Sequence, residues 1–344
     1  MSTETPALGR IRPADHPPGP GPAASTAAAP GLAHHLLHRP ATAEGLMLGT
    51  AAPVTQHFTL SARLPEHHPL FNDGPGIFHD LHYPVEAMRQ SVLFVAHQYF
   101  RVPVQRSVVL ASTELGISDL EAWRRAGRPA NIAVDMALHP MDVVNGVPRG
   151  LNCESELSIN GMPAGAAKAR TVFLMPNVYH NHRARGRAAS RGAELGGYVD
   201  ALVDSRPGPE AVGRSDPRNV VITAPLPSAD EHLRVLVAAQ TAHPVFTANT
   251  TDHVPAVVLL EASRQAAFLA AGELHGFSAA HCALTRWNAR FKGFAEVDLP
   301  LYCTVHAEEL GRDADGRRTF PVTLAFTQGT REITTVAVEV TQDY

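Results

Sequence analysis

Two triplets of polar residues stand inside apolar segments of this chain, and both have the same internal spacing. Each consists of a glutamate, an arginine three residues later and a glutamine directly after the arginine: Glu86, Arg89 and Gln90, and then Glu261, Arg264 and Gln265. Side chains three and four residues apart share one face of a helix, so each triplet brings a carboxylate, a guanidinium and an amide together. Carboxylates transfer protons and guanidinium groups bind anions, which makes each triplet a candidate site.

The triplets belong to a longer repeat with a fixed offset of 175 residues. His68-Pro69-Leu70-Phe71 reappears as His243-Pro244-Val245-Phe246, and the glutamate of a triplet follows each phenylalanine fifteen residues later. Self-similarity at one register over about sixty residues indicates two similar domains. The length of 344 residues agrees with this, at roughly 150 residues per domain. We predict a first domain at 44–205 and a second at 206–344.

The composition limits the compartment and the partners. The net charge of -4 does not indicate a nucleic-acid partner, and no apolar stretch is long enough to span a membrane. Three cysteines without close spacing favour a reducing compartment, so we expect a cytoplasmic protein. Residues 1–43 are rich in proline and alanine and lack an apolar period, so we predict a disordered tail.

The spacing of apolar residues predicts one long helix in each domain, at about 84–100 and 255–273, with strands after each. The second helix is apolar on nearly all sides, as in a helix that a curved sheet wraps. We therefore predict an α+β fold, with a linker at about 183–197. Glu261 and Arg264 would incur a desolvation cost inside such a helix. They form either a functional site or an internal polar clamp at the domain interface.

Turn residues mark the ends of several predicted elements. Asn160-Gly161 predicts a tight turn between two strands of the first domain, and Asp315-Gly316 predicts one in the second. Gly276 is well placed as the left-handed cap of the second helix. A further strand is predicted at 220–223.

The second helix and the residues before it carry a family signature. Asp252-His253-Val254-Pro255, followed by the apolar run and the triplet up to residue 267, resembles the signature of the A-factor biosynthesis (AfsA-type) hotdog family. Val212-Gly213-Arg214 resembles the segment that enters the second repeat of that family. The family makes γ-butyrolactone and related butenolide or furan signalling molecules in actinomycetes. The resemblance covers about residues 44–344 and implies a double hotdog, in which two hotdog units pack as an intramolecular pseudo-dimer.

The sequence also departs from related patterns. Ala256 stands where the family commonly has glycine, which would narrow the approach of a thioester to the helix N-terminus. Hotdog dehydratases carry a similar glutamate and a catalytic histidine fourteen residues earlier. Here those earlier positions hold Asn72 and Thr247, which argues against simple dehydration.

The resemblance implies an acyltransferase that joins a 3-oxoacyl group to the hydroxyl of dihydroxyacetone phosphate. The acyl group would arrive on the phosphopantetheine of an acyl carrier protein, and no other cofactor is expected. The hydroxyl needs a base, for which a carboxylate with a pKa raised by apolar surroundings is suited. The oxyanion needs the free N–H groups of a helix N-terminus, and the phosphate needs a guanidinium. The candidates are Glu86, Glu261, Arg264 and His253 for catalysis, and Arg89, Gln90 and Gln265 for substrate binding.

Several alternatives remain open at this point. A hotdog thioesterase or dehydratase, or a non-catalytic acyl-binding module, would share much of this pattern. His79-Asp80-Leu81-His82 and His180-Asn181-His182 lack the spacing of a known metal site, so no metal is predicted. The basic residues of the linker are either a solvated loop or a docking surface for an acidic carrier protein; they are Arg183, Arg185, Arg187 and Arg191.

Overall fold

The computed structural model of the chain describes residues 47–50, 56–190, 205–227, 232–238 and 252–344. The predicted tail therefore lies outside the described residues. None of the helices in the described ranges is long and apolar enough to cross a membrane.

In its described residues, the first half of the chain forms one long helix and six strands. Its elements are β1 (Met47–Thr50), β2 (His57–Leu64), α2 (His82–Gln98), β3 (Ser107–Ile117), β4 (Ala130–Met141), β5 (Gly150–Ile159) and β6 (Met162–Leu174). Alternate residues of β2 are buried, since one face of the strand packs on the helix and the other faces solvent. Asn160 and Gly161 both have positive φ and form the tight turn between β5 and β6, which confirms that prediction.

The second half repeats this plan around its own helix. Its elements are β7 (Leu233–Leu236), α6 (Ala256–His275), β8 (Cys282–Phe291), β9 (Tyr302–Ala307), β10 (Gly311–Arg312), β11 (Arg318–Gln328) and β12 (Arg331–Gln342). Gly276 ends α6 with a φ of 67°, as its sequence position predicts. The predicted strand at 220–223 does not form; Ile222 makes one isolated bridge to Val237.

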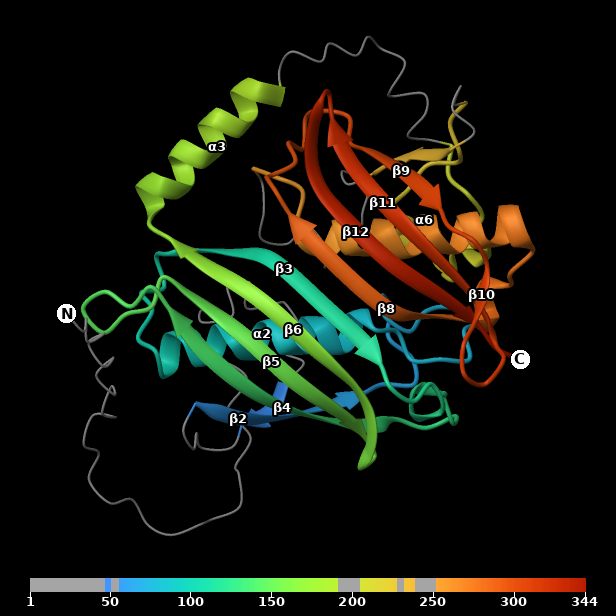
Figure 1. The fold of residues 1–344 in the computed structure, drawn as a ribbon, viewed down its shortest axis with the longest axis horizontal. Coiled ribbons are helices and arrows are strands. Elements are labelled where there is room, and N and C mark those ends of the chain that lie inside the picture. Colours follow the sequence, from blue (N-terminus) through green and yellow to red (C-terminus); the bar gives the residue numbers. More distant parts are fainter. Residues whose placement is uncertain (1–46, 51–55, 191–204, 228–231, 239–251) are drawn as a thin grey trace, which may run out of the picture.

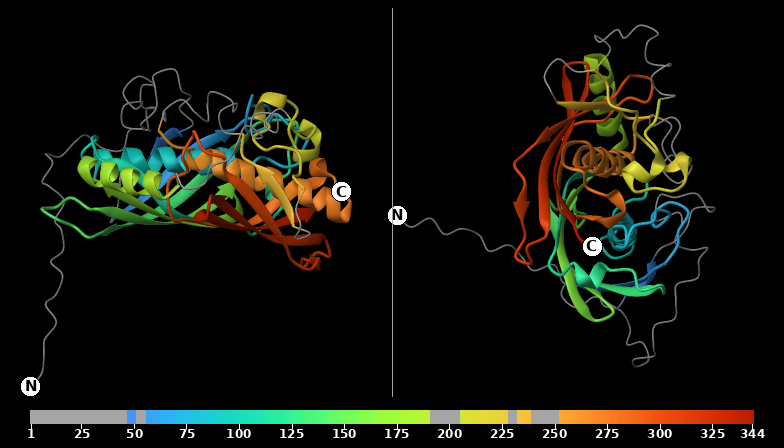
Figure 2. Two further views of the ribbon diagram at one scale, coloured as in Figure 1. Left: turned by 90° about the horizontal axis from the view of Figure 1, so that it is seen from above. Right: turned by 90° about the vertical axis from the view of Figure 1, so that its right-hand side faces the viewer.

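The strands of the described residues all join in one antiparallel sheet, and the two halves meet between β3 and β8. The order is β1-β2-β4-β5-β6-β3-β8-β12-β11-β9-β7, with β10 beside β11. Residues 112–116 of β3 pair with 286–290 of β8. Both helices lie on the same, concave side of this curved sheet (Figures 1 and 2). Each half is thus a long helix wrapped by antiparallel strands, and the predicted double hotdog is confirmed.

Helix α6 is buried along most of its length. Every residue from Val258 to Ala271 is buried, including the three members of the second triplet. This agrees with the apolar periodicity of the sequence. The polar side chains of this helix must therefore find partners inside the protein.

The predicted linker is partly a helix. Helix α3 (Pro176–Ser190) occupies the first part of the segment predicted as irregular, and residues 191–197 lie outside the described residues. Alanine and arginine are strong helix formers and proline is favoured at the first helical position, so the local sequence supports this helix. One face of α3 packs on the second unit, where Arg331 donates to the carbonyl of Gly186. Figure 1 shows α3 beside the ends of β6 and β12.

Candidate active site

A cavity of about 650 Å³ lies between the two units. Its walls come from α2, the N-terminus of α6, strands β3 and β6, and helix α3. Much of the lining is apolar, with Val85, Met88, Val92, Val108, Leu110 and Leu174 among it. Polar side chains from both units also reach this space, so it combines an apolar chamber with groups that can do chemistry.

The first triplet lies on the α2 wall of this cavity. Arg89 donates its Nε to Glu86 Oε2 at 2.7 Å and its Nη2 to Oε1 at 2.8 Å. Gln90 Nε2 donates to the same carboxylate at 3.1 Å. Burial alone would lower the pKa of Arg89, but the charge and hydrogen bonds of Glu86 outweigh it and raise that pKa. The structure thus brings the predicted acid, cation and amide together, with Glu86 and Arg89 facing the cavity.

The N-terminus of α6 forms another wall of the cavity. Pro255, Ala256 and Val257 line the cavity. The first helical hydrogen bond of α6 is donated by Val258 to the carbonyl of Pro255. The N–H groups of Ala256 and Val257 therefore precede the intrahelical ladder and are free to donate to a ligand. This is the arrangement that stabilises a developing oxyanion.

His253 stands just before this helix end and forms a dyad with its neighbour. Its Nδ1 lies 2.7 Å from Asp252 Oδ1, which leaves Nε2 for a ligand. Burial lowers the pKa of His253 and the attraction of Asp252 opposes this only in part. The imidazole is therefore neutral near pH 7 and able to accept a proton. Since His253 lines the cavity, the structure places it where the sequence predicted a site residue.

Helix α3 supplies a third member of this group. Tyr179 donates its hydroxyl to Asp252 Oδ2 at 2.7 Å and lies 3.3 Å from His253 Nδ1. Burial, and then the nearby Asp252 carboxylate, raise the pKa of Tyr179, so the phenol stays protonated and keeps donating. The sequence gives no signal for Tyr179, because this residue is 73 positions away from Asp252 and belongs to no motif. The Asp-His adjacency was visible, but Asp252 was not singled out.

Arg183 fixes α3 to the second unit. It donates its Nη1 and Nη2 to the buried carboxylate of Glu296 at 2.7 and 2.9 Å. It also donates to the backbone carbonyl of Asp252. These bonds hold the helix that carries Tyr179 against the loop that carries His253.

The second triplet is elsewhere, in the buried interior. Glu261, Arg264 and Gln265 are absent from the wall of the large cavity. Glu261 is fully buried, and Arg214 donates to both of its carboxylate oxygens at 2.9 and 2.7 Å. Arg264 donates to the same two oxygens at 3.1 and 2.9 Å. Gln265 accepts from the Val221 N–H at 2.9 Å and thus holds the chain that enters the second unit.

The electrostatics of Glu261 differ from the expectation for a base. Burial by itself would raise its pKa, but the charges of Arg214, Arg264 and His82 outweigh burial and hold the pKa of Glu261 well below its usual range. The prediction of a raised pKa is therefore wrong for Glu261. An apolar helix surrounds it, as the sequence indicated, yet the nearest charges decide the direction.

Arg214 connects this interior cluster to the first unit. Its guanidinium also lies 3.0 Å from Asp73 and 2.8 Å from Asp80. The preceding Gly213 has a φ of 69°, and a side chain there would meet Arg264 and Phe268. Asp80, His82 and Glu261 place ligand atoms within 4.8 Å of one another, but the two arginines already donate to the carboxylates. Arg214 belongs to the family-like segment Val212-Gly213-Arg214, but the sequence did not predict that it would form the centre of a buried ion cluster.

The two triplets occupy equivalent positions in two unlike sites. The offset of 175 residues maps Glu86 on Glu261 and Leu81 on Ala256. The large cavity is lined by the N-terminus of α6 and by Glu86. At the equivalent position of the other unit, a second pocket is lined by Leu81, which directly precedes α2, and by Arg264. That second pocket has a volume of only about 50 Å³, with Arg214 in its wall. One of the two sites is open, and buried ion pairs occupy much of the other.

The chain matches the model of the AfsA family, described as an A-factor biosynthesis hotdog domain, over residues 26–175 and 206–342. It belongs to this family. The match confirms the resemblance seen in the signature at 252–267. The two matched ranges also correspond to the two halves that share the sheet, so each hotdog unit is one copy of the family domain.

Three similar proteins carry the same name. The chain is 29% identical over 289 residues to the 2-oxo-3-(phosphooxy)propyl 3-oxoalkanoate synthase of Streptomyces coelicolor, covering 84% of this chain and 85% of that protein. A protein of the same name from Streptomyces griseus is 31% identical over 62% of this chain and 67% of its own length. That from Streptomyces virginiae is 27% identical over 84% of this chain and 90% of its own length.

Proposed function

We propose that the protein is an acyltransferase that condenses a 3-oxoacyl thioester of an acyl carrier protein with a hydroxyl of dihydroxyacetone phosphate. The name of its relatives describes an ester between a 3-oxoalkanoate and a 2-oxo-3-(phosphooxy)propyl group, which is phosphorylated dihydroxyacetone. The observation that carries the proposal is the open cavity. There a neutral histidine, a free helix N-terminus and a guanidinium–carboxylate pair surround one apolar chamber.

His253 is the proposed base. Its Nε2 accepts the proton of the acceptor hydroxyl while the hydroxyl oxygen attacks the thioester carbonyl carbon. The carbon–oxygen bond forms and the carbonyl oxygen gains negative charge. When the tetrahedral intermediate collapses, the carbon–sulfur bond breaks and the thiolate takes the proton back from His253. Asp252 holds the ring by its Nδ1 and stabilises the imidazolium in between.

The helix N-terminus is the proposed oxyanion site. The N–H groups of Ala256 and Val257 donate to the oxygen that becomes charged, and the helix dipole favours negative charge at the same point. Ala256 stands where glycine is common in the family, and its methyl group narrows this approach without removing the donor.

Arg89 is the proposed phosphate ligand. Its side chain is about one-third exposed and lies on the cavity wall, whereas Arg264 is buried against Glu261. Arg331 belongs to the same cavity lining and adds positive charge, and Lys292 also lines the cavity but pairs with Glu332. Glu86 orients Arg89 through two hydrogen bonds. Because Glu86 also faces the cavity, it is the second candidate for the base.

We further propose that the reaction uses acid–base and electrostatic groups of the chain, with no cofactor beyond the phosphopantetheine of the carrier. The acyl chain would occupy the apolar part of the cavity. All three cysteines are buried free thiols, which supports the expectation of a cytoplasmic protein.

The test is a direct assay with a 3-oxooctanoyl carrier protein and dihydroxyacetone phosphate. Release of carrier thiol should depend on the phosphate substrate, and mass spectrometry should find the phosphorylated ester. Equal thiol release without dihydroxyacetone phosphate would instead support a thioesterase. A protein that binds the acyl carrier but releases no thiol in either case would be an acyl-binding module.

A further inference from the structure

Three neighbouring segments at one end of the first unit form what we call the end surface. They are residues 101–106 after α2, residues 141–149 between β4 and β5, and residues 174–187 at the end of β6 and in α3. Arg106 donates to the carbonyl of Pro148 at 3.0 Å, and the N–H of Phe173 donates to the carbonyl of Arg149 at 2.8 Å. These bonds join the three segments into one continuous face.

The end surface exposes an unusual number of aliphatic side chains. Ten large apolar side chains are exposed in the part of the chain that the structure describes, and five belong to these segments: Val104, Val143, Val144, Met175 and Val178. Single exposed apolar residues are ordinary, but a cluster of them marks a contact surface.

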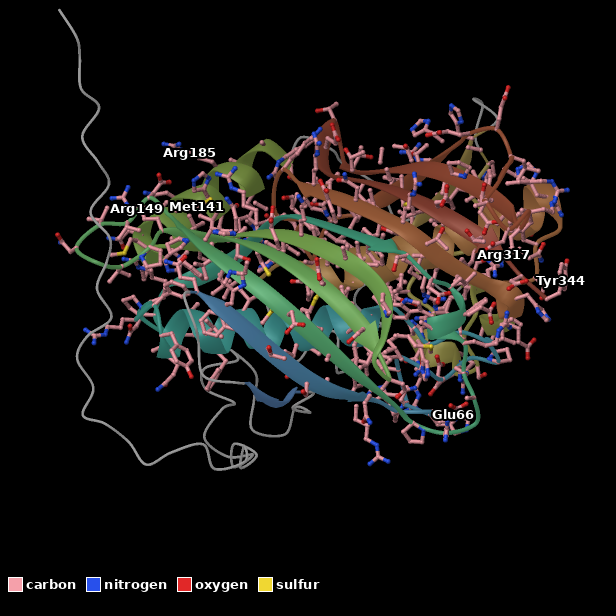
Figure 3. The ribbon with its side chains drawn as sticks, turned by 60° about the horizontal axis from the view of Figure 1, so that its bottom comes forward. Glu66, Met141, Arg149, Arg185, Arg317 and Tyr344 are labelled. Atoms are coloured by element: carbon pink, nitrogen blue, oxygen red, sulfur yellow. The ribbon has the colours of Figure 1, made fainter. Side chains whose placement is uncertain are left out.

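The same surface is basic. Its three segments contain six arginines and one acidic residue, Asp142, although two of the arginines, Arg183 and Arg187, pair with Glu296 and Asp298. Arg101, Arg149 and Arg185 are exposed, and none of the three forms a salt bridge with any described residue. Figure 3 shows Arg149 and Arg185 at the same end of the molecule, with Glu66 at the far end. Aliphatic groups among unpaired arginines suit a partner whose contact face is acidic and partly apolar.

The end surface adjoins the walls of the large cavity. Ser107 and Val108 line the cavity directly after the first segment, and Leu174 lines it directly before Met175. On α3, Tyr179 and His182 face the cavity while Val178 and Arg185 are exposed. A partner on this surface would therefore stand beside the chamber that holds the reacting groups.

We propose that the end surface is the docking site of the acyl carrier, an acidic protein that presents the 3-oxoacyl group on a flexible arm. This rests on the proposed function, which requires such a carrier. A second copy of this chain would bring like charges together at the same face. An anionic lipid surface would match the charge but would present no thioester to the cavity.

The experiment compares the full-length protein with the double variant Arg149→Glu/Arg185→Glu. The KM for the 3-oxooctanoyl carrier protein should rise at least about tenfold, because two attractive charges become repulsive. The kcat, and the KM for the same acyl group on N-acetylcysteamine, should stay within about twofold. The matched control is Arg128→Glu. Arg128 is also an exposed arginine, but it lies three residues after Arg125, and Arg125 donates its Nε to Glu66, which is far from the end surface. It should leave both KM values unchanged.

A direct binding measurement tests the docking site independently of the reaction. The Kd for the fluorescently labelled holo carrier should rise in the double variant by a similar factor and should depend on salt. If the carrier binds in a way that depends on the two arginines but no ester forms, the proposed reaction is wrong and the proposed docking site is supported. If the double variant has unchanged Kd and KM for the carrier, the docking site is wrong. It is also wrong if the double variant loses equal activity with the carrier thioester and the N-acetylcysteamine thioester. Loss of binding to phosphatidylglycerol vesicles alone would identify a membrane as the partner instead.

Discussion

Arg214 donates two hydrogen bonds, at 2.9 and 2.7 Å, to the carboxylate of Glu261, a residue 47 positions later that has no exposed surface. The same guanidinium contacts Asp73 and Asp80 of the first unit. This pair therefore ties the helix of the second unit to the loop that begins the helix of the first.

Glu261→Gln should destabilise the protein by about 3–5 kcal/mol, because two buried arginines lose their shared carboxylate. Thermal unfolding would measure this. Glu154→Gln is the control, since its pair with Lys168 is exposed and its loss should change stability by less than about 1 kcal/mol. The folded Glu261→Gln protein should keep most of its activity. A variant with unchanged melting temperature and a hundredfold lower turnover would return Glu261 to the catalytic role that the sequence suggested.

His253→Asn should lower kcat by about 10²–10⁴-fold, as expected when a general base is lost. The pKa of His253 is lowered from 6.5, and a base acts only when deprotonated. The rate of the native enzyme should therefore be level at neutral pH and fall on the acid side through a pKa below 6.5. If Glu86 is the base, Glu86→Gln will abolish that limb and His253→Asn will retain it.

Tyr179→Phe should act through Asp252 and not on the substrate. Removing the phenol leaves the carboxylate with one donor fewer, so its attraction for the imidazole proton grows. The acid limb of the pH–rate profile should move to higher pH, with a modest fall in kcat and no change in KM. An unchanged profile would reduce Tyr179 to packing against Phe294.

Arg89→Lys should weaken dihydroxyacetone phosphate more than the acyl thioester. A lysine keeps the charge but cannot reproduce the forked contact with phosphate. The KM for the phosphate substrate should rise about tenfold or more, and that for the thioester should change little. Arg264→Lys, the equivalent change in the filled site, should lower the melting temperature and leave both KM values alone.

Acid should weaken the fold through the interior carboxylates. The pKa of Glu261 is lowered from 4.5 to about 2, and that of Asp80 is lowered from 3.8, mainly because the charge of Arg214 outweighs burial. Groups with depressed pKa values stabilise the folded state fully above their unfolded pKa. This stabilisation is lost as pH falls through the folded values. The melting temperature should thus drop steeply below about pH 4.5, and less steeply in Glu261→Gln than in the Glu154→Gln control.

The sequence predicted the elements well because their signals are local. The helix expected at 255–273 is α6 at 256–275, and the one expected at 84–100 is α2 at 82–98. Periodicity, turn residues and the repeat register were sufficient for both. The main difference is helix α3: the arginines and glycine of this segment predict an irregular linker, but the segment forms a helix.

The site was less predictable, because the two triplets are identical in type. Whether a glutamate faces a cavity or a buried ion cluster depends on Arg214, Asp73 and Asp80, which are distant in sequence from Glu261. The same holds for Tyr179, which reaches Asp252 only because α3 docks on the second unit. Tertiary contacts of this kind leave no periodic trace.

The unequal pair of sites has a consequence for how such a protein can evolve. A homodimer of a single hotdog chain is bound by symmetry, so any residue that fills one site fills the other as well. Once both copies share one polypeptide, each can change alone. In this chain one of the two equivalent positions holds a cluster of buried ion pairs, and the other holds an open cavity. The buried ion pairs can then hold the two walls of the open cavity at a fixed separation. Two identical subunits cannot assign these two roles to different copies of the site.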